Sequence, residues 1–196
     1  MGSSSKMEVG QMKIKGTAFL GRKVFIVKVF GVETWANLLK EIAGRNPFFE
    51  REIMPITLIE EDDFLEFNDF IVKKLYGGNK EIYWTFGDES AKWALTEGPL
   101  KAFMASNKIE HFIGTVSHLW KSYYNEGQAG VKNIGANLYD VEISGVELRH
   151  VYYEYTTFGF LKTGLILSGA KKVKLDCVRG FSKGQRDILY KVSISL

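Results

Sequence analysis

The chain has 196 residues, of which 45% are hydrophobic and 25% are charged, so it is long and apolar enough for one globular domain with a core. Its net charge of +3 is well mixed, and no block of Lys and Arg is long enough to predict a nucleic-acid or membrane-surface site. The single Cys excludes an internal disulfide and favours a cytoplasmic location, and no apolar run reaches the about 18 residues expected of a membrane span.

The chain opens with MGSSS, which is typical of a cloning remnant and not of a signal peptide. We expect residues 1–12 to form a disordered lead and residues 13–196 to form a single ligand-binding domain.

The first two-thirds of the domain predicts helices. Lys13 to Gly31 favours a helix that stops at Gly31, although its Val, Phe and Ile content also suits a strand. Further helices are predicted up to Gly44, from Glu60 to Gly77, from Lys80 to Ala94 and from Pro99 to Met104. A longer helix is expected from about Asn107 to Gly127, with Phe112, Val116, Trp120 and Tyr123 on one face.

The last third changes character. NLYDVEISG alternates apolar and polar residues and predicts a strand, and HVYYEYTT, from His150 to Thr157, also favours a strand because it is rich in Tyr and Thr. FGFLKTGLILSG predicts a helix that ends at Gly169, and KKVKLDCVRG and RDILYKVSISL predict a hairpin. The fold class is therefore α+β, with helical N-terminal two-thirds packed on a C-terminal antiparallel sheet that has one inserted helix.

No catalytic constellation emerges, so we do not expect an enzyme. His111 and His118 lie seven residues apart on the long predicted helix, but no carboxylate or third His completes a metal site. Cys177 alternates with apolar residues and has no base beside it in the sequence to activate its thiol. GQAGVKNIG lacks the Lys-Ser/Thr of a phosphate-binding loop.

Aromatic residues are the remaining signal, with 14 Phe, 9 Tyr and 4 Trp in the chain. Large rings fill cores and also line apolar cavities, so a solid core and a ligand cavity both remain open. If the long helix lies over the sheet, side chains from both would wall a cavity. The candidate ligand-binding residues are Phe112, Val116, Trp120, Tyr123, Tyr153, Tyr155, Phe158, Phe160 and Leu161.

The order of segments resembles a known family. KGT near the start, FIGTVSHLWKSYYNEG, YYEYTTFGFLKTGLILSG and the final hairpin are similar to heme-NO-binding (H-NOX) domains and to their fold relatives, the vinyl-reductase-type domains and the small TRAPP subunits. The resemblance is closest to an uncharacterised bacterial family of myxobacterial type that lacks the heme motifs. It covers nearly the whole chain after Lys13 and implies the H-NOX/TRAPP-like fold.

The heme motifs of that family are altered here. The position of the proximal His, counted from Phe112, holds Trp120, and His118 comes two residues earlier. The Tyr-x-Ser-x-Arg motif that grips heme propionates aligns with Tyr152, Glu154 and Thr156, where the Arg is absent and a glutamate would repel a propionate. These departures favour no cofactor, and His118 would be the axial ligand if heme bound.

The resulting hypothesis is a cytoplasmic, non-enzymatic signalling sensor or lipid-binding domain for a small hydrophobic ligand such as a fatty acid, without heme. One alternative is a protein-protein interaction or dimerisation module with a solid interior. A second alternative is a heme-based gas sensor that uses His118. The expected partners are the small molecule and either a second copy of the chain or a signalling protein, with no nucleic acid.

Overall fold

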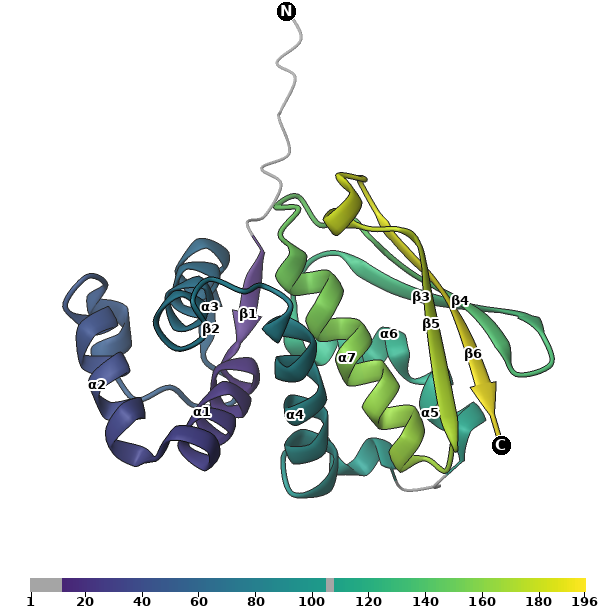
Figure 1. Ribbon diagram of the computed structural model, residues 1–196, viewed down its shortest axis with the longest axis horizontal. Coiled ribbons are helices and arrows are strands. Elements are labelled where there is room, and N and C mark those ends of the chain that lie inside the picture. Colours follow the sequence, from purple (N-terminus) through teal and green to yellow (C-terminus); the bar gives the residue numbers. More distant parts are fainter. Residues whose placement is uncertain (1–11, 105–107) are drawn as a thin grey trace, which may run out of the picture.

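The computed structural model of the protein describes residues 12–104 and 108–196. Figure 1 shows helices at the N-terminal end, two long helices in the middle and an antiparallel sheet at the C-terminal end. The predicted α+β class and arrangement are therefore confirmed. Most of the predicted lead, residues 1–11, lies outside the described residues, and Met12 is buried. Within the described residues, no helix has both the length and the apolar character needed to cross a membrane.

The N-terminal group packs around clustered aromatic rings. Its elements in chain order are β1 (Lys13–Lys15), α1 (Gly16–Phe30), α2 (Val32–Ala43), η1 (Pro47–Glu50), β2 (Leu58–Glu60) and α3 (Glu61–Tyr76). β1 and β2 form an antiparallel pair that the sequence did not predict. Gly31, at φ +87°, ends α1 and lets α2 turn back, so that the rings of Phe19, Trp35 and Phe67 meet at centroid distances of 5.0–5.9 Å.

The predicted long helix from Asn107 to Gly127 is two helices. Helix α4 (Ile82–Thr96) and the turn η2 (Lys101–Met104) precede it, as expected. Asn107 lies outside the described residues, α5 runs over Ile109–Gly114 and α6 over Val116–Tyr123. The break occurs at Thr115, whose hydroxyl donates to the carbonyl oxygen of Phe112 at 2.7 Å, a local bond that competes with helical geometry.

The C-terminal sheet has the strand order β3-β4-β6-β5, and every neighbouring pair is antiparallel. Its strands are β3 (Gln128–Gly135), β4 (Leu138–Ser144), β5 (Lys172–Arg179) and β6 (Ile188–Ser195), with the short turn η3 (Phe181–Lys183) between the last two. The hairpin of β5 and β6 and strand β4 are confirmed. The sequence missed β3 because it is an edge strand on which Ala129 alone is buried, so no apolar alternation marks it.

Helix α7 (Val151–Leu167) corrects the prediction of a strand from His150 to Thr157. The imidazole Nδ1 of His150 accepts the backbone N–H of Tyr152 at 3.1 Å, and this bond caps the first turn. The consecutive residues Tyr152, Tyr153 and Glu154 are all buried, because α7 is covered by α4 on one side and by the sheet on the other. Burial on several sides outweighs the strand propensity of Tyr and Thr.

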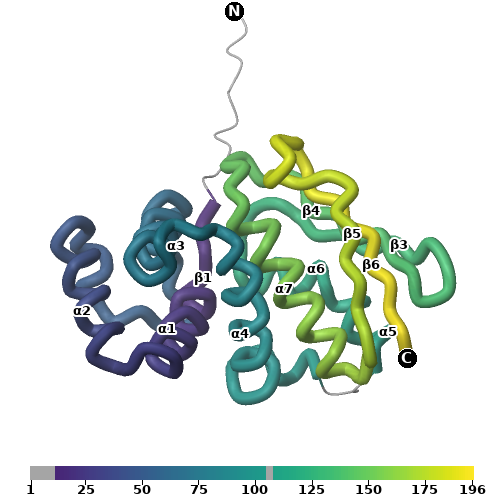
Figure 2. Tube along the Cα trace, in the orientation of Figure 1, coloured from purple at the N-terminus to yellow at the C-terminus, as the bar shows by residue number. Residues whose placement is uncertain are grey.

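Helices α4 and α7 lie side by side at the centre of the molecule (Figure 2). Two glycines allow this approach. A Cβ atom on Gly87 would overlap the backbone carbonyl of Thr156, and one on Gly159 would overlap the carbonyl of Trp84. Because neither position has room for a side chain, the backbones of the two helices are in direct contact.

We expect Gly87→Ala to lower the free energy of unfolding by about 1–3 kcal/mol, because the added methyl group forces α4 away from α7. Urea unfolding measures the change. Gly114→Ala is the matched control, since nothing lies within 4 Å of its Cβ position, and its stability should stay within about 1 kcal/mol of the parent. Equal effects of the two substitutions would contradict the tight helix crossing.

Candidate ligand-binding cavity

A cavity lies where the N-terminal group, the central helices α4 and α7, helix α6 and the C-terminal sheet meet. Helices α1, α4, α6 and α7 and strand β3 all contribute to its wall. The lining residues are Ala18, Gly87, Ser90, Val116, Leu119, Trp120, Tyr123, Tyr124, Ala129, Tyr152, Thr156, Thr157, Phe160 and Leu161. The N-terminal group, the central helices and the sheet therefore all face the same partly open space.

The free space in this cavity is about 60 Å³, and its lining is mostly apolar. A water molecule needs roughly 10–15 Å³ measured in this way, and an engineered apolar cavity of about 150 Å³ takes up benzene. The cavity therefore holds a very small molecule as it stands, and a larger guest needs a movement of the wall.

The structure brings five of the predicted ligand-binding residues to this wall, namely Val116, Trp120, Tyr123, Phe160 and Leu161. Trp120 is fixed in place because its indole N–H donates to the carbonyl oxygen of Glu126 at 2.9 Å, and its ring lies 4.3 Å from that of Tyr124. The edge of the Tyr123 ring meets Phe160 at a centroid distance of 5.7 Å.

The other four predicted residues lie elsewhere, each for a specific reason. Phe112 is buried against the bare backbone of Gly164. Tyr153 turns toward α3 and donates to Glu61 at 2.6 Å. The ring of Tyr155 stacks on Trp84, and that of Phe158 stacks on Tyr190 of β6 at 3.9 Å. Helical geometry explains the error, because a strand would have put Tyr153 and Tyr155 on the same face.

Sequence reasoning missed the small residues of the wall. Ala18, Gly87, Ser90 and Ala129 come from three separate elements, and their short side chains leave the free space open. No local pattern marks them, because small residues are common throughout any chain and acquire this role only when the elements assemble.

Two hydroxyl groups on α6 and α7 differ sharply in their surroundings. The Tyr123 hydroxyl is buried and has no hydrogen-bond partner among the described residues, and burial raises the pKa of this phenol. The Tyr153 hydroxyl, in contrast, donates to the buried carboxylate of Glu61. An unpaired buried hydroxyl beside a cavity is available to a guest.

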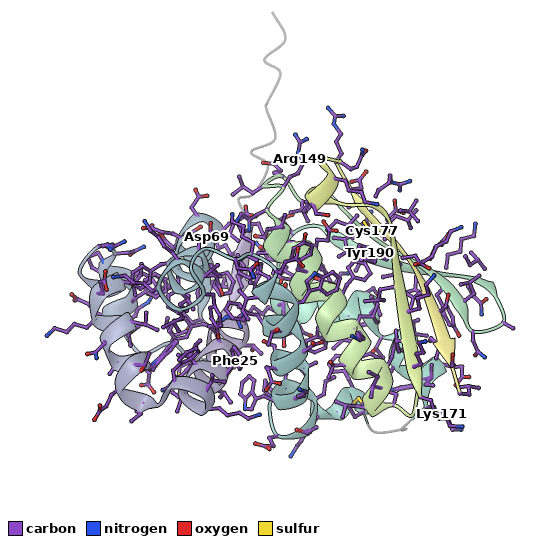
Figure 3. The ribbon with its side chains drawn as sticks, in the orientation of Figure 1. Phe25, Asp69, Arg149, Lys171, Cys177 and Tyr190 are labelled. Atoms are coloured by element: carbon purple, nitrogen blue, oxygen red, sulfur yellow. The ribbon has the colours of Figure 1, made fainter. Side chains whose placement is uncertain are left out.

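Glu154 does not face the cavity. It is completely buried and accepts hydrogen bonds from the Tyr190 hydroxyl at 2.7 Å and from the backbone N–H and hydroxyl of Ser182, both at 2.8 Å. Its Oε1 also lies 3.6 Å from the Cys177 sulfur, and Figure 3 shows Cys177 and Tyr190 next to each other on the sheet. Glu154 therefore anchors α7 to the terminal hairpin, and its charge does not repel a guest in the cavity.

The histidines also lie away from the wall. His111 and His118 are exposed on α5 and α6, and His150 is occupied at the start of α7, where its Nε2 lies 3.3 Å from Asp69. Burial raises the pKa of Asp69, but hydrogen bonds from His150 and Tyr83 and the charge of Lys80 outweigh this effect and lower it to about 2. Among the described residues, no group of three or more His, Cys, Asp or Glu side chains could hold a metal ion.

Comparison with solved structures identifies the fold. An H-NOX protein from S. oneidensis in the Fe(II)NO ligation state superimposes with a TM-score of 0.74 and 14% identity, covering 93% of this chain and 99% of that one. An oxygen-binding H-NOX domain related to soluble guanylate cyclases, in its oxygen complex, gives 0.71 and 15%, covering 93% and 95%. The chain thus has the H-NOX fold, as the resemblance implied. No protein-family model and no curated protein sequence matches it.

The expectation that the chain takes no cofactor is corrected by this comparison. Solved structures of the same fold are described by an Fe(II)NO ligation state and by the redox potential of a heme, so the fold is one that holds heme. The altered heme motifs of this chain therefore do not exclude a cofactor.

The residues of this chain can be tested against heme directly. No imidazole or thiol lines the cavity, and His118, the proposed axial ligand, is exposed. Tyrosine hydroxyls are the iron-ligating groups on the wall, but burial raises the pKa of Tyr123 and so disfavours the phenolate that binds iron. As arranged in this structure, the wall does not fit heme iron.

We expect Tyr123→Phe to leave the free energy of unfolding unchanged or to raise it by up to about 1 kcal/mol, because the lost hydroxyl has no partner. Tyr153→Phe is the comparison variant. It should lower the free energy of unfolding by about 1–3 kcal/mol, since it removes the bond to buried Glu61. Denaturant unfolding of both proteins measures the difference. A larger loss for Tyr123→Phe would mean that this hydroxyl is already paired, for example with bound water.

Proposed function

We propose that this chain is a non-enzymatic sensor domain that binds a small, largely apolar molecule in the cavity between its two halves. The observation that carries the proposal is the cavity itself, which is walled by Trp120, Tyr123 and Phe160 and lined by α1 and α7 as well as by α4 and α6. Proteins of this fold described as Fe(II)NO and oxygen complexes hold small, weakly polar molecules, which supports a guest of that kind.

The chemistry of the wall favours binding over catalysis. Its polar groups are hydroxyls, including those of Ser90, Thr156 and Tyr123, and none of the lining residues is an acid, an imidazole or a thiol. A guest would therefore gain most of its affinity from burial, about 25 cal/mol for each Å² of apolar surface removed from water. Such an environment discriminates by size and shape and does not move protons.

The position of the cavity suggests a way in which a bound guest would be sensed. Ala18 belongs to α1 of the N-terminal group, whereas Trp120 belongs to α6 and Ala129 to β3. A guest larger than the about 60 Å³ now free must move these parts relative to one another, and it would favour the more open of two packings. A signalling protein or a second copy of the chain would read this change in the cytoplasm.

The proposal is tested with an uncharged ligand and with a substitution that fills the cavity with an apolar side chain. We expect 1-hexanol to bind the protein, and we expect Ala18→Leu to weaken this binding by about tenfold or more, because the longer side chain occupies the guest's space. Isothermal titration calorimetry gives the affinities. Ala43→Leu, on α2 and outside the cavity wall, is the matched control and should bind 1-hexanol as the parent does.

Other outcomes would overturn the proposal. Failure of the parent protein to bind 1-hexanol, together with a solvent extract that contains no co-purified molecule, would favour an interaction module. A Soret band on addition of hemin that Ala18→Leu abolishes would assign the cavity to a porphyrin instead.

A further inference from the structure

Arg22, in the middle of α1, is buried without a carboxylate partner. It is 1% exposed and is among the largest fully buried side chains of the molecule. No Asp or Glu oxygen lies within 4.0 Å of it among the described residues. Burial lowers the pKa of Arg22 to about 10, so the guanidinium still carries its charge near neutral pH.

The neighbours of Arg22 satisfy only part of the guanidinium. Its Nε donates to Asn68 Oδ1 at 3.0 Å, and its Cζ lies 3.3 Å from the centre of the Phe86 ring. Its Nη1 is buried and has no hydrogen-bond partner among the described residues. Since a buried charge is costly unless it is paired, this atom lacks the acceptor it needs.

The other buried charges of the interior are better satisfied. Glu154 accepts from Tyr190 and from Ser182, and Glu61 accepts from Tyr153. Arg22 therefore stands out as a buried charge with an unpaired donor, and in the part of the chain that the structure describes the two buried acids, Glu61 and Glu154, are hydrogen-bonded elsewhere.

Arg22 does not itself line the cavity, but it lies behind the wall, because Tyr152, which lines the cavity, is a hydrogen-bonding neighbour of Arg22. Ala18, one turn earlier on α1, lines the cavity, and the adjacent Gly21 packs against Ser90, which also lines it. Tyr152 and Tyr123 are on the wall, and although burial raises the pKa of each phenol, the charge of Arg22 acts on both in the opposite direction. Nη1 of Arg22 and the Tyr123 hydroxyl are both buried and unpaired among the described residues, and the two side chains are close enough for the charge of Arg22 to act on the phenol.

We propose that the guest of this cavity is a small carboxylic acid, whose carboxylate pairs with Arg22 while its apolar body lies against Trp120 and Phe160. This inference rests on the proposed function and adds the chemical class of the ligand. A carboxylate matches the planar fork of a guanidinium and forms short, charge-assisted hydrogen bonds with it. It would also accept the hydrogen bond that the Tyr123 hydroxyl has free.

The test compares an acid with an alcohol of the same chain length. We expect the parent protein to bind hexanoate about tenfold or more tightly than 1-hexanol near neutral pH. Arg22→Met should abolish this preference and leave the affinity for 1-hexanol within about twofold, because it removes the charge and keeps most of the volume. Lys23→Met is the matched control, since it removes an exposed cation of the same helix and should retain the preference.

The outcomes separate this inference from the proposed function. Equal binding of hexanoate and 1-hexanol by the parent would contradict the proposed carboxylate ligand but not the proposed apolar binding site. Water would then be the partner of Arg22. Binding of neither would remove both proposals. If Arg22→Met does not fold, Arg22→Lys takes its place, and it should weaken hexanoate more than 1-hexanol because a lysine keeps the charge and loses the fork. Retention of the full preference in either variant would overturn the proposal.

Discussion

The contact between α4 and α7 constrains the rest of the molecule. Gly87 and Gly159 bring the two backbones together, and this contact fixes how far α7 stands from the N-terminal helices. Gly87 is itself part of the cavity wall, so the close crossing and the free space are neighbours on the same helix. Protein interiors are densely packed, so a defined free space needs a local cause. Here the close helix crossing and the small side chains beside it provide that cause.

Helix α7 divides its side chains between two environments. Tyr152, Thr156 and Phe160, four residues apart, face the cavity, whereas Glu154 and Phe158 face the terminal hairpin. The buried bonds of Glu154 hold one side of the helix to the sheet. A guest on the other side would therefore act on a helix that is held firmly to the sheet.

The sequence predicted the class, the terminal hairpin and most helices, because those rest on local periodicity and on stops such as Gly31 and Gly77. It failed where tertiary contacts decide. HVYYEYTT has strand propensity, yet it is helical because it is buried from both sides, and β3 has no apolar alternation because it is an edge. Of the aromatic side chains on the cavity wall, Trp120, Tyr123 and Phe160 were among the candidates from the sequence and Tyr124 and Tyr152 were not. The small residues Ala18, Ser90 and Ala129 could not be predicted, since only the assembled fold brings them together.

The cavity and the unpaired guanidinium of Arg22 together indicate a ligand more specifically than either feature alone. An apolar space of about 60 Å³ would by itself be a packing defect, and a buried Arg would by itself be a structural residue held by Asn68 and Phe86. One amphipathic molecule would satisfy both features: its apolar part would fill the cavity, and its anionic group would pair with the guanidinium of Arg22. Because Arg22 belongs to α1 and Trp120 to α6, such a molecule would contact both helices at once. Its binding would therefore be coupled to how α1 and α6 pack against each other.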